Sequence, residues 1–241
     1  MNDNEFIIGV LGGMGTFATI NLFEQYANIF PAEKEWERPR IIIDNHCTMP
    51  SRVRAILYDE NKNKLIAQMT DSLRLLINAG ATNIILGCNT SHIFLPEIYK
   101  TYPEAEEKII NIIDTCVDTL IKNKINSVYL LATEGTILSN VYQQKLEKAN
   151  IECLTPDDGE LTDLRDCIEA VKQNNYTENI KRKFIDFIER HNTCILGCTE
   201  LPLLYKRYRS EINPNITVYD PLKLALYKVK ENYIVATGGK L

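Results

Sequence analysis

The sequence contains the segment Asn83-Ile-Ile-Leu-Gly-Cys88 and, in its second half, the similar segment Thr193-Cys-Ile-Leu-Gly-Cys198. Each segment is a short apolar run that ends at Gly-Cys and is followed by polar residues. A run of this length, bounded by a turn signal, predicts a buried β-strand. Each copy therefore places a cysteine at the carboxyl end of a predicted strand.

Strand-like and helical patterns alternate on both sides of these segments. Apolar strand-like runs occur at 6–11, 40–44, 83–86, 127–132, 151–154 and 194–196. Helical periodicity covers 16–30, 64–79, 136–149, 163–171 and 178–190. Such alternation is typical of parallel sheets with helices on both faces. The sequence therefore predicts an α/β fold.

The two halves of the chain align coarsely. In each half a first strand runs into a Gly/Thr-rich turn, Gly12–Gly15 or Thr133–Thr136, and a later strand ends at Gly-Cys. We expect two similar lobes with the ligand cleft between them, because open α/β sheets bind ligands at the carboxyl ends of their strands. The predicted boundaries are 1–100 for the N-terminal lobe, completed by a closing strand and helix within about 212–241, and 101–211 for the C-terminal lobe.

The composition limits the possible partners and compartments. A chain of 241 residues with 45% hydrophobic and 24% charged residues can bury a substantial core. A net charge of −5 argues against a nucleic-acid partner, and we interpret the basic clusters at 181–183 and 206–209 as solvated faces. No apolar run approaches the roughly 18 residues of a membrane helix. The acidic N-terminus is unlike a signal peptide. Seven cysteines without an export signal then favour a reducing cytoplasm.

The glycine-rich turn after the first strand has three possible interpretations. Gly13-Met-Gly15-Thr-Phe-Ala18 fits the dinucleotide pattern G-x-G-x-x-G/A. Asp44 could then bind a ribose, but it lies about 30 residues further on rather than the usual ~20. The same glycines suit any tight turn whose backbone N–H groups bind an anion. We favour the anion-binding turn and keep the dinucleotide site and a purely structural turn as alternatives.

The cysteines show no pattern of a metal site or a disulfide. Cys194 and Cys198 would lie about 13 Å apart on an extended segment, too far for one ion or for a disulfide, and no Cys-x-x-Cys pair exists. We interpret Cys116, Cys153 and Cys167 as small buried apolar residues. Cys88 with His92 could be the nucleophile of a hydrolase, but this would leave Cys198 unexplained.

Two matched thiols across a cleft suit the inversion of a stereocentre next to a carboxylate. Inversion needs a base on one face of the carbon and an acid on the other. A thiol can serve because its local environment can bring its pKa close to ambient pH. Since the roles exchange for the opposite enantiomer, both residues should be of the same type. Cys88 and Cys198 are therefore the candidate acid/base pair.

Several motifs together resemble a known family. Gly12-Gly-Met-Gly15 with Ala18-Thr19, Cys88-Asn-Thr90 with Ser91-His92, Thr133-Glu-Gly-Thr136 and Leu196-Gly-Cys-Thr-Glu-Leu-Pro202 occur in order over nearly the whole chain. This pattern resembles the aspartate/glutamate racemase superfamily, specifically its aspartate racemase branch. Glu200 stands where the glutamate racemase branch carries histidine. The resemblance implies a cofactor-independent, two-base amino-acid racemase that acts on aspartate and forms a homodimer.

The resemblance also implies roles for individual residues. Cys88 and Cys198 are the expected catalytic pair, Asn89 and Thr90 bind one carboxylate, and Thr199 and Glu200 lie near the amino group. Arg52, in a Pro-x-Arg segment, and Lys172, in a Val-Lys segment, are candidates for the second carboxylate, although each could also be a surface cation. Met14 and Ser91 complete the predicted substrate-binding set, and no metal is expected. Thr16 and Ser51 depart from the family pattern, which has proline and aspartate there. The missing acid beside Arg52 bears on which side chain is recognised.

Other functions stay open at this point. The enzyme could racemise glutamate or a broader set of amino acids, or use pyridoxal phosphate, which requires a Schiff-base lysine that the sequence does not identify. An NAD-dependent oxidoreductase and a non-catalytic amino-acid-binding protein are the alternatives from other classes.

Overall fold

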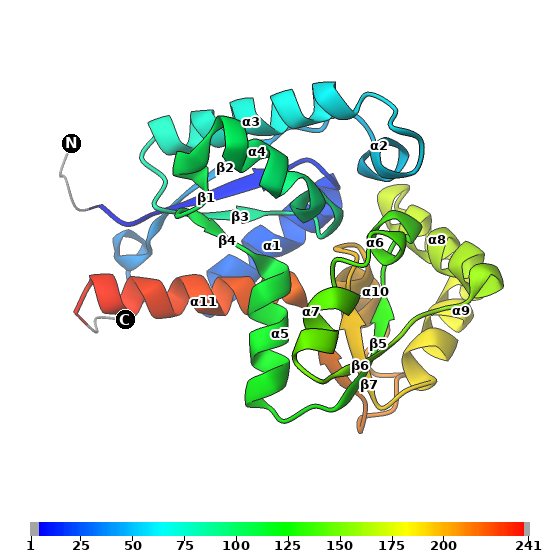
Figure 1. Cartoon of the computed structure of the whole chain (residues 1–241). Helices are drawn as coiled ribbons and strands as arrows, with labels where there is room; N and C mark the ends of the chain where they lie inside the picture. Colours follow the sequence, from blue (N-terminus) through cyan, green and yellow to red (C-terminus); the bar gives the residue numbers. More distant parts are fainter. Residues whose placement is uncertain (1–4, 239–241) are drawn as a thin grey trace.

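Two four-stranded parallel sheets form the centres of two lobes (Figure 1). The computed structural model describes residues 5–238. The first sheet has the strand order β2-β1-β3-β4 and the second the order β6-β5-β7-β8, so the two sheets share one topology. This confirms the predicted α/β fold of two similar lobes.

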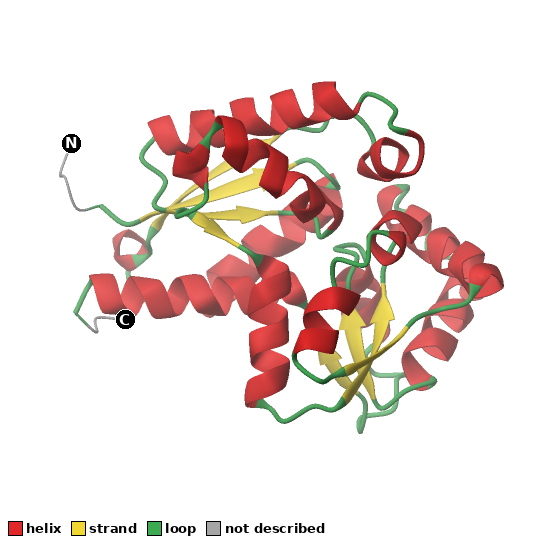
Figure 2. Cartoon of the chain, in the orientation of Figure 1, coloured by secondary structure: helices red, strands yellow, loops and turns green. Residues whose placement is uncertain are grey.

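The first sheet and its helices occupy the first half of the chain. Strand β1 is buried along its whole length, as expected for a central parallel strand covered on both faces. Figure 2 shows helices on both faces of this sheet. The elements are β1 (Ile7–Gly12), α1 (Thr16–Ile29), β2 (Arg40–Asn45), α2 (Arg52–Tyr58), α3 (Lys62–Asn78), β3 (Asn83–Leu86), α4 (Leu95–Thr101) and β4 (Ile109–Ile110), with short 3₁₀ turns at Glu35–Glu37, Thr90–Phe94 and Pro103–Ala105.

The second half of the chain repeats this arrangement. Its elements are α5 (Ile112–Lys122), β5 (Ser127–Leu131), α6 (Glu134–Leu138), α7 (Gln143–Lys148), β6 (Glu152–Leu154), α8 (Asp158–Lys172), α9 (Glu178–Glu189), β7 (Thr193–Leu196), α10 (Leu201–Tyr208), β8 (Thr217–Tyr219) and α11 (Pro221–Ala236). The single helix expected over 136–149 is two helices, because Asn140 adopts a left-handed conformation between them. Among residues 5–238 no helix is both long and apolar enough to cross a membrane.

The two sheets divide the chain at points other than the expected residues 100 and 212. Strand β4 pairs with β3 in the first sheet, although it lies beyond residue 100. Strand β8, expected to close the N-terminal lobe, pairs instead with β7 in the second sheet. Of the expected closing strand and helix, only the helix, α11, packs as expected, against α1 of the first lobe and against α5. The sequence could not reveal this division because β4 has only two residues.

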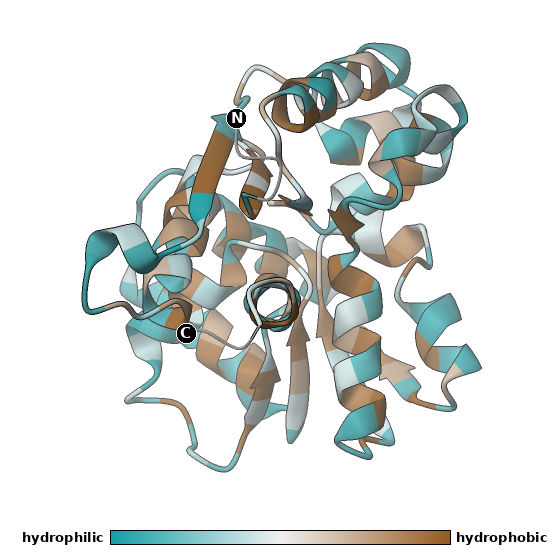
Figure 3. Ribbon diagram, turned by 90° about the vertical axis from the view of Figure 1, so that its left-hand side faces the viewer, coloured by the Kyte–Doolittle hydropathy of each residue, from teal (hydrophilic) through white to brown (hydrophobic). Residues whose placement is uncertain are grey.

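One hydrophobic cluster includes residues of both sheets. It contains Val10 of β1 and Leu130 of β5, together with Val117 of α5 and Val229 of α11. Hydrophobic residues extend along the strands in Figure 3. Helices α5 and α11 therefore connect the cores of the two lobes, and the lobes are fixed relative to each other by burial of shared apolar surface.

The glycine of each Ile-Leu-Gly-Cys copy packs against the neighbouring central strand. A Cβ atom at Gly87 would lie 3.3 Å from the carbonyl oxygen of Leu11, and one at Gly197 would lie 2.8 Å from Cδ1 of Leu130. A side chain would thus crowd each turn against the strand beneath it. Glycine lets the chain turn directly over the strand end and places the next residue, cysteine, at the carboxyl edge of each sheet.

The turn between β1 and α1 depends on Gly13. Its φ is +79°, and a Cβ atom there would lie 2.5 Å from the backbone nitrogen of Cys47. We expect Gly13→Ala to lower the free energy of unfolding by about 2 kcal/mol or more, because left-handed strain costs about 1–3 kcal/mol and a backbone atom cannot move aside as a side chain does. Urea denaturation measures this loss.

A glycine in helix α8 provides the control. At Gly159 a Cβ atom would meet only Oδ1 of Asp157 at 3.4 Å. Gly159→Ala should therefore leave stability unchanged or raise it by up to about 1 kcal/mol, the usual helix preference for alanine. If Gly13→Ala were as stable as Gly159→Ala, the turn would not need glycine.

Candidate active site

The two strand-end cysteines line one cavity between the lobes. Cys88 follows β3 and Cys198 follows β7, which occupy equivalent positions in the two sheets. The cavity has a volume of about 60 Å³. It is lined by Met14, Ser51, Arg52, Val53, Cys88, Asn89, Thr90, Thr133, Lys172, Gly197, Cys198, Thr199 and Glu200. Residues far apart in the sequence thus meet at the facing edges of the two sheets.

All of the predicted site residues except Ser91 line this cavity. The Ser91 hydroxyl donates to the carbonyl oxygen of Cys88 at 2.7 Å, so it stabilises the turn after β3. Its expected contact with substrate stays a prediction that the cavity lining does not support. The prediction missed Ser51, Val53, Thr133 and Gly197 as lining residues. Thr133 could have been predicted, because it begins the Thr-Glu-Gly-Thr motif. No motif in the sequence points to Val53.

Asn89 presents a free hydrogen-bond donor beside Cys88. The Tyr142 hydroxyl donates to Oδ1 of Asn89, which fixes the orientation of the amide. The Nδ2 group is buried and has no partner among the described residues. A buried polar group without a partner is costly, so this N–H₂ is suited to an oxygen atom of a ligand.

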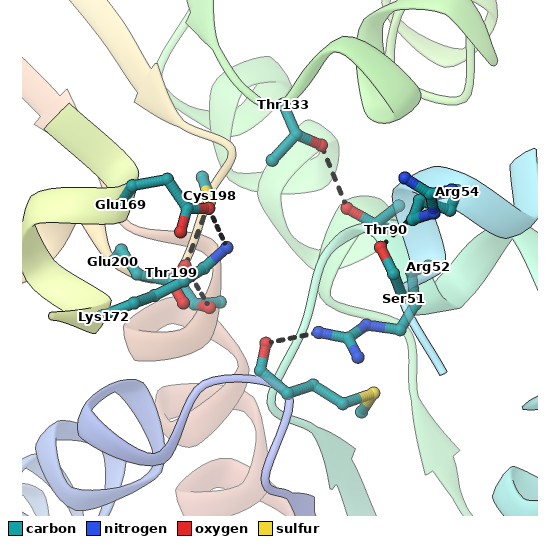
Figure 4. A network of polar contacts seen from close by, with 11 residues as sticks. Ser51, Arg52, Arg54, Thr90, Thr133, Glu169, Lys172, Cys198, Thr199 and Glu200 are labelled. Carbon is teal, nitrogen blue, oxygen red and sulfur yellow. Dashed lines mark hydrogen bonds and ion pairs between the residues drawn. The ribbon is translucent and has the colours of Figure 1, made fainter. Parts of the chain in front are cut away.

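Three threonine hydroxyls connect the lobes at the edge of the cavity. Thr90 lies 2.8 Å from Thr136 and 3.3 Å from Thr133, and Thr133 lies 3.1 Å from Thr136. Figure 4 shows the Thr90 and Thr133 side chains directed toward each other. Because Thr90 belongs to one lobe and the other two to the second, this threonine cluster holds the cleft at a defined width.

A buried carboxylate contacts the Cys198 thiol. The Sγ atom of Cys198 donates to Oε2 of Glu200 at 3.0 Å, and the Thr199 hydroxyl donates to the same oxygen at 3.3 Å. Burial raises the pKa of the Cys198 thiol well above its usual value, and the charge and hydrogen bond of Glu200 raise it further. Lys172 opposes this shift. Oε1 of Glu200 has no hydrogen-bond partner within residues 5–238 and lies against Gly15, where any Cβ atom would collide with it.

Two cations line the cavity from opposite lobes. Arg52 donates to the carbonyl oxygens of Met14 and Pro50, and its Nε is buried without a hydrogen-bond partner among the described residues. Lys172 donates to Glu169 at 2.7 Å. Burial alone would lower the pKa of Lys172, but the hydrogen bond to Glu169 and the negative charge of Glu200 raise it above its usual value. Lys172 is therefore positively charged, and the two cations can attract an anionic ligand.

His92 supports the turn after β3 and does not contact the thiol. Its Nδ1 lies 3.0 Å from the carbonyl oxygen of Cys88, and the backbone N–H of Ile112 donates to Nε2. Burial lowers the pKa of His92 to about 4, so the ring is neutral at pH 7. Because both ring nitrogens are engaged by backbone groups, His92 is not placed to act as the base of a Cys–His nucleophile.

Neither a metal-ligand cluster nor a favourable dinucleotide site is found among residues 5–238. Residues 5–238 contain no cluster of three or more His, Cys, Asp or Glu side chains that could hold a metal ion. The turn between β1 and α1 packs against the Glu200 carboxylate at Gly15. A pyrophosphate at the same turn would meet this negative charge, which argues against the dinucleotide interpretation.

Comparison with known proteins agrees with this geometry. Residues 11–229 match a family model described as Asp/Glu/Hydantoin racemase. The chain belongs to this racemase family. The resemblance found in the sequence is thereby confirmed, as is its assignment to a family of isomerases.

Relatives of this racemase family member cover nearly its whole length. A broad specificity amino-acid racemase from Bacillus subtilis is 26% identical over 214 residues, 86% of this chain and 90% of that protein. The structure of Picrophilus torridus aspartate racemase has a TM-score of 0.81 and 26% identity, covering 98% of this chain and 100% of that one. A Francisella tularensis glutamate racemase in complex with D-glutamate shares the fold, with a TM-score of 0.67 and 20% identity over 99% of this chain and 84% of that one.

The contact between Tyr142 and Asn89 can be tested by removing one hydroxyl. Tyr142→Phe leaves Oδ1 of Asn89 buried without a donor, which should lower the free energy of unfolding by about 1–3 kcal/mol. The Tyr99 hydroxyl has no hydrogen-bond partner among the described residues, so Tyr99→Phe is the matched control and should cost little. Equal stability of the two variants in urea denaturation would contradict the role given to Tyr142.

The burial of neutral His92 predicts a pH dependence of stability. The unfolded chain binds a proton at His92 near its ordinary pKa of 6.5, whereas the folded protein binds it only near 4. Stability should therefore fall as the pH drops below 6.5, by about 2 kcal/mol from this residue between pH 7 and pH 5. Urea denaturation of wild type and His92→Gln at both pH values isolates this contribution. An identical pH dependence in the two proteins would show that His92 is not buried in its neutral form.

Proposed function

We propose that the protein is a cofactor-independent amino-acid racemase in which Cys88 and Cys198 exchange protons with the substrate Cα from opposite faces. The observation that carries this proposal is the convergence of two strand-end thiols in one cavity, from equivalent positions of two similar lobes. Membership of a racemase family supports the same chemistry.

The proposed reaction moves two protons. The thiolate of one cysteine removes the Cα proton and becomes a thiol, while the thiol of the other cysteine donates its proton to the opposite face of Cα. Negative charge builds up on the substrate carboxylate between these steps. The free Nδ2 donor of Asn89 and the guanidinium of Arg52, whose Nε is buried without a partner among the described residues, would stabilise that charge. For the opposite enantiomer the cysteines exchange roles.

Aspartate is the substrate we propose first. A substrate with two carboxylates suits a cavity that has one cation on each side, Arg52 from the N-terminal lobe and Lys172 from the C-terminal lobe. The structural likeness to an aspartate racemase at 26% identity agrees with this choice.

A broader specificity is the second candidate, and a neighbouring pocket favours it. A pocket of about 430 Å³ between α2, α6 and α8 shares Ser51, Val53, Thr133 and Lys172 with the thiol cavity. A side chain longer than that of aspartate could extend from the cavity into this space. The Bacillus subtilis relative is a broad specificity amino-acid racemase, which agrees with this second candidate.

The proposed chemistry also bears on compartment and assembly. All seven cysteines are free, and two of them must stay reduced to carry protons, which supports a reducing cytoplasm. The homodimer implied by the family resemblance stays a prediction.

Incubation with L-aspartate in deuterium oxide tests the reaction itself. We expect D-aspartate to form with deuterium at Cα, without added pyridoxal phosphate or NAD. Cys88→Ser and Cys198→Ser should each lower the racemisation rate by about 10²- to 10⁴-fold, which is the usual contribution of one acid/base group. Cys47→Ser, at an exposed cysteine outside the cavity, is the control and should keep wild-type turnover.

Other results would point to other functions. Near-normal turnover of either active-site serine variant would contradict the two-thiol mechanism. Activity only with NAD would indicate an oxidoreductase, and binding of aspartate without exchange would indicate a binding protein. A panel of acidic, neutral and basic amino acids distinguishes the two candidate specificities.

A further inference from the structure

The two cavity thiols are equally buried but have different partners. Cys88 and Cys198 are each 7% exposed, so access to solvent does not distinguish them. The Cys198 thiol donates to Oε2 of Glu200 at 3.0 Å. No hydrogen bond reaches Sγ of Cys88 from any residue between 5 and 238. The pair is therefore asymmetric, although the fold places its members at equivalent positions.

The charges around Cys198 favour its protonated form. A thiolate there would lie 3.0 Å from a carboxylate in a buried site, where like charges repel strongly. Lys172 is the cation on this side of the cavity, but it also pairs with Glu169 at 2.7 Å. One ammonium group thus already faces two carboxylates. A thiolate would add a third negative charge, while a thiol adds none and supplies Glu200 with a hydrogen bond.

The Glu200 carboxylate is held in place by groups other than the thiol. The Thr199 hydroxyl donates to the oxygen that accepts from Cys198, and Gly15 of the opposite lobe packs against the other oxygen. Arg52, the cation of that lobe, is bound to the Met14 and Pro50 carbonyls and forms no hydrogen bond with Glu200. The position of the carboxylate is therefore set by both lobes, and the thiol proton is directed at a fixed acceptor.

We propose that Glu200 is a positioning residue that keeps Cys198 in its thiol form in the free protein, so that Cys88 is the base of the resting state. The catalytic meaning of this asymmetry rests on the proposed racemase function, whereas the Glu200–Cys198 interaction itself does not. In one turnover of the enantiomer whose Cα proton faces Cys88, Cys88 takes up that proton and Cys198 gives up its own. Cys88 is then a thiol and Cys198 a thiolate. Return to the resting state then moves one proton from Cys88 to Cys198, through solvent or a second substrate.

Steady-state specificity cannot reveal this asymmetry. The equilibrium constant of a racemisation is one, so kcat/KM must be equal for the two enantiomers whichever cysteine holds the proton at rest. The asymmetry must instead be measured on the thiols themselves. Alkylation reports it because only the thiolate reacts.

The test is alkylation of the intact protein by iodoacetamide without substrate, over a range of pH, with peptide mass spectrometry to follow each cysteine. In wild type we expect Cys88 to react at lower pH than Cys198. In Glu200→Gln the midpoint of the Cys198 profile should move down by about one pH unit or more, which is a tenfold larger thiolate fraction below the midpoint. We compare the midpoints of the pH profiles and not the alkylation rates, because a thiolate becomes less nucleophilic as the pKa of its thiol falls.

Three controls accompany this measurement. The Cys88 profile in the same Glu200→Gln molecules should not move, which also verifies that the cavity is intact. Glu134→Gln removes a carboxylate that is paired with Arg165 and does not contact the thiol, so it should leave both profiles unchanged. Glu200→Asp keeps the charge but withdraws it from the thiol, and its Cys198 midpoint should fall between those of wild type and Glu200→Gln.

The outcomes separate this proposal from the proposed function. If the Cys198 midpoint is the same in wild type, Glu200→Asp and Glu200→Gln, or if Cys198 reacts before Cys88 in wild type, the role given to Glu200 is wrong even in an active racemase. If the midpoint shifts as expected in a protein that does not racemise amino acids, the positioning by Glu200 stands and the proposed function fails.

Discussion

Burial of a shared apolar surface by α5 and α11 holds the two lobes in one relative placement. Everything in the cavity depends on it, because the two thiols belong to different sheets and neither lobe forms the site alone. The threonine cluster adds hydrogen bonds at the cleft itself. Since shared cores are close-packed and deform little, a cavity of only about 60 Å³ can be maintained between two separate sheets.

The two halves of the cavity are similar in backbone and different in charge. Each half ends a buried strand with glycine and cysteine, so the sulfur atoms reach the cleft by the same route. Beyond that point one half offers an amide donor that is oriented by a tyrosine, and the other offers a carboxylate and an ammonium group. A duplicated fold thus supplies matched positions for two thiols, while the residues after them give each thiol its own environment.

Much of this arrangement could be predicted from the sequence because it follows local patterns. The strands, the turn at Gly13 and the placement of two cysteines at strand ends need only periodicity and turn signals. The contacts that define the site could not be predicted in this way. Tyr142 contacts Asn89 from the opposite lobe. Ser91 turns toward the Cys88 carbonyl, although Asn89 and Thr90 just before it line the cavity. Strand β4 is too short for any periodic pattern, and the break at Asn140 is a backbone conformation that the helical pattern hides.

The contact between Gly15 and Glu200 has a consequence for how such a sequence can change. These positions lie in different lobes, and a side chain at residue 15 would occupy the space of the Glu200 carboxylate. Substitutions at the two positions are therefore epistatic: a larger residue at one is tolerated only with a smaller or redirected residue at the other. A chimera that joins the N-terminal lobe of one relative to the C-terminal lobe of another therefore needs residues at these two positions that fit each other.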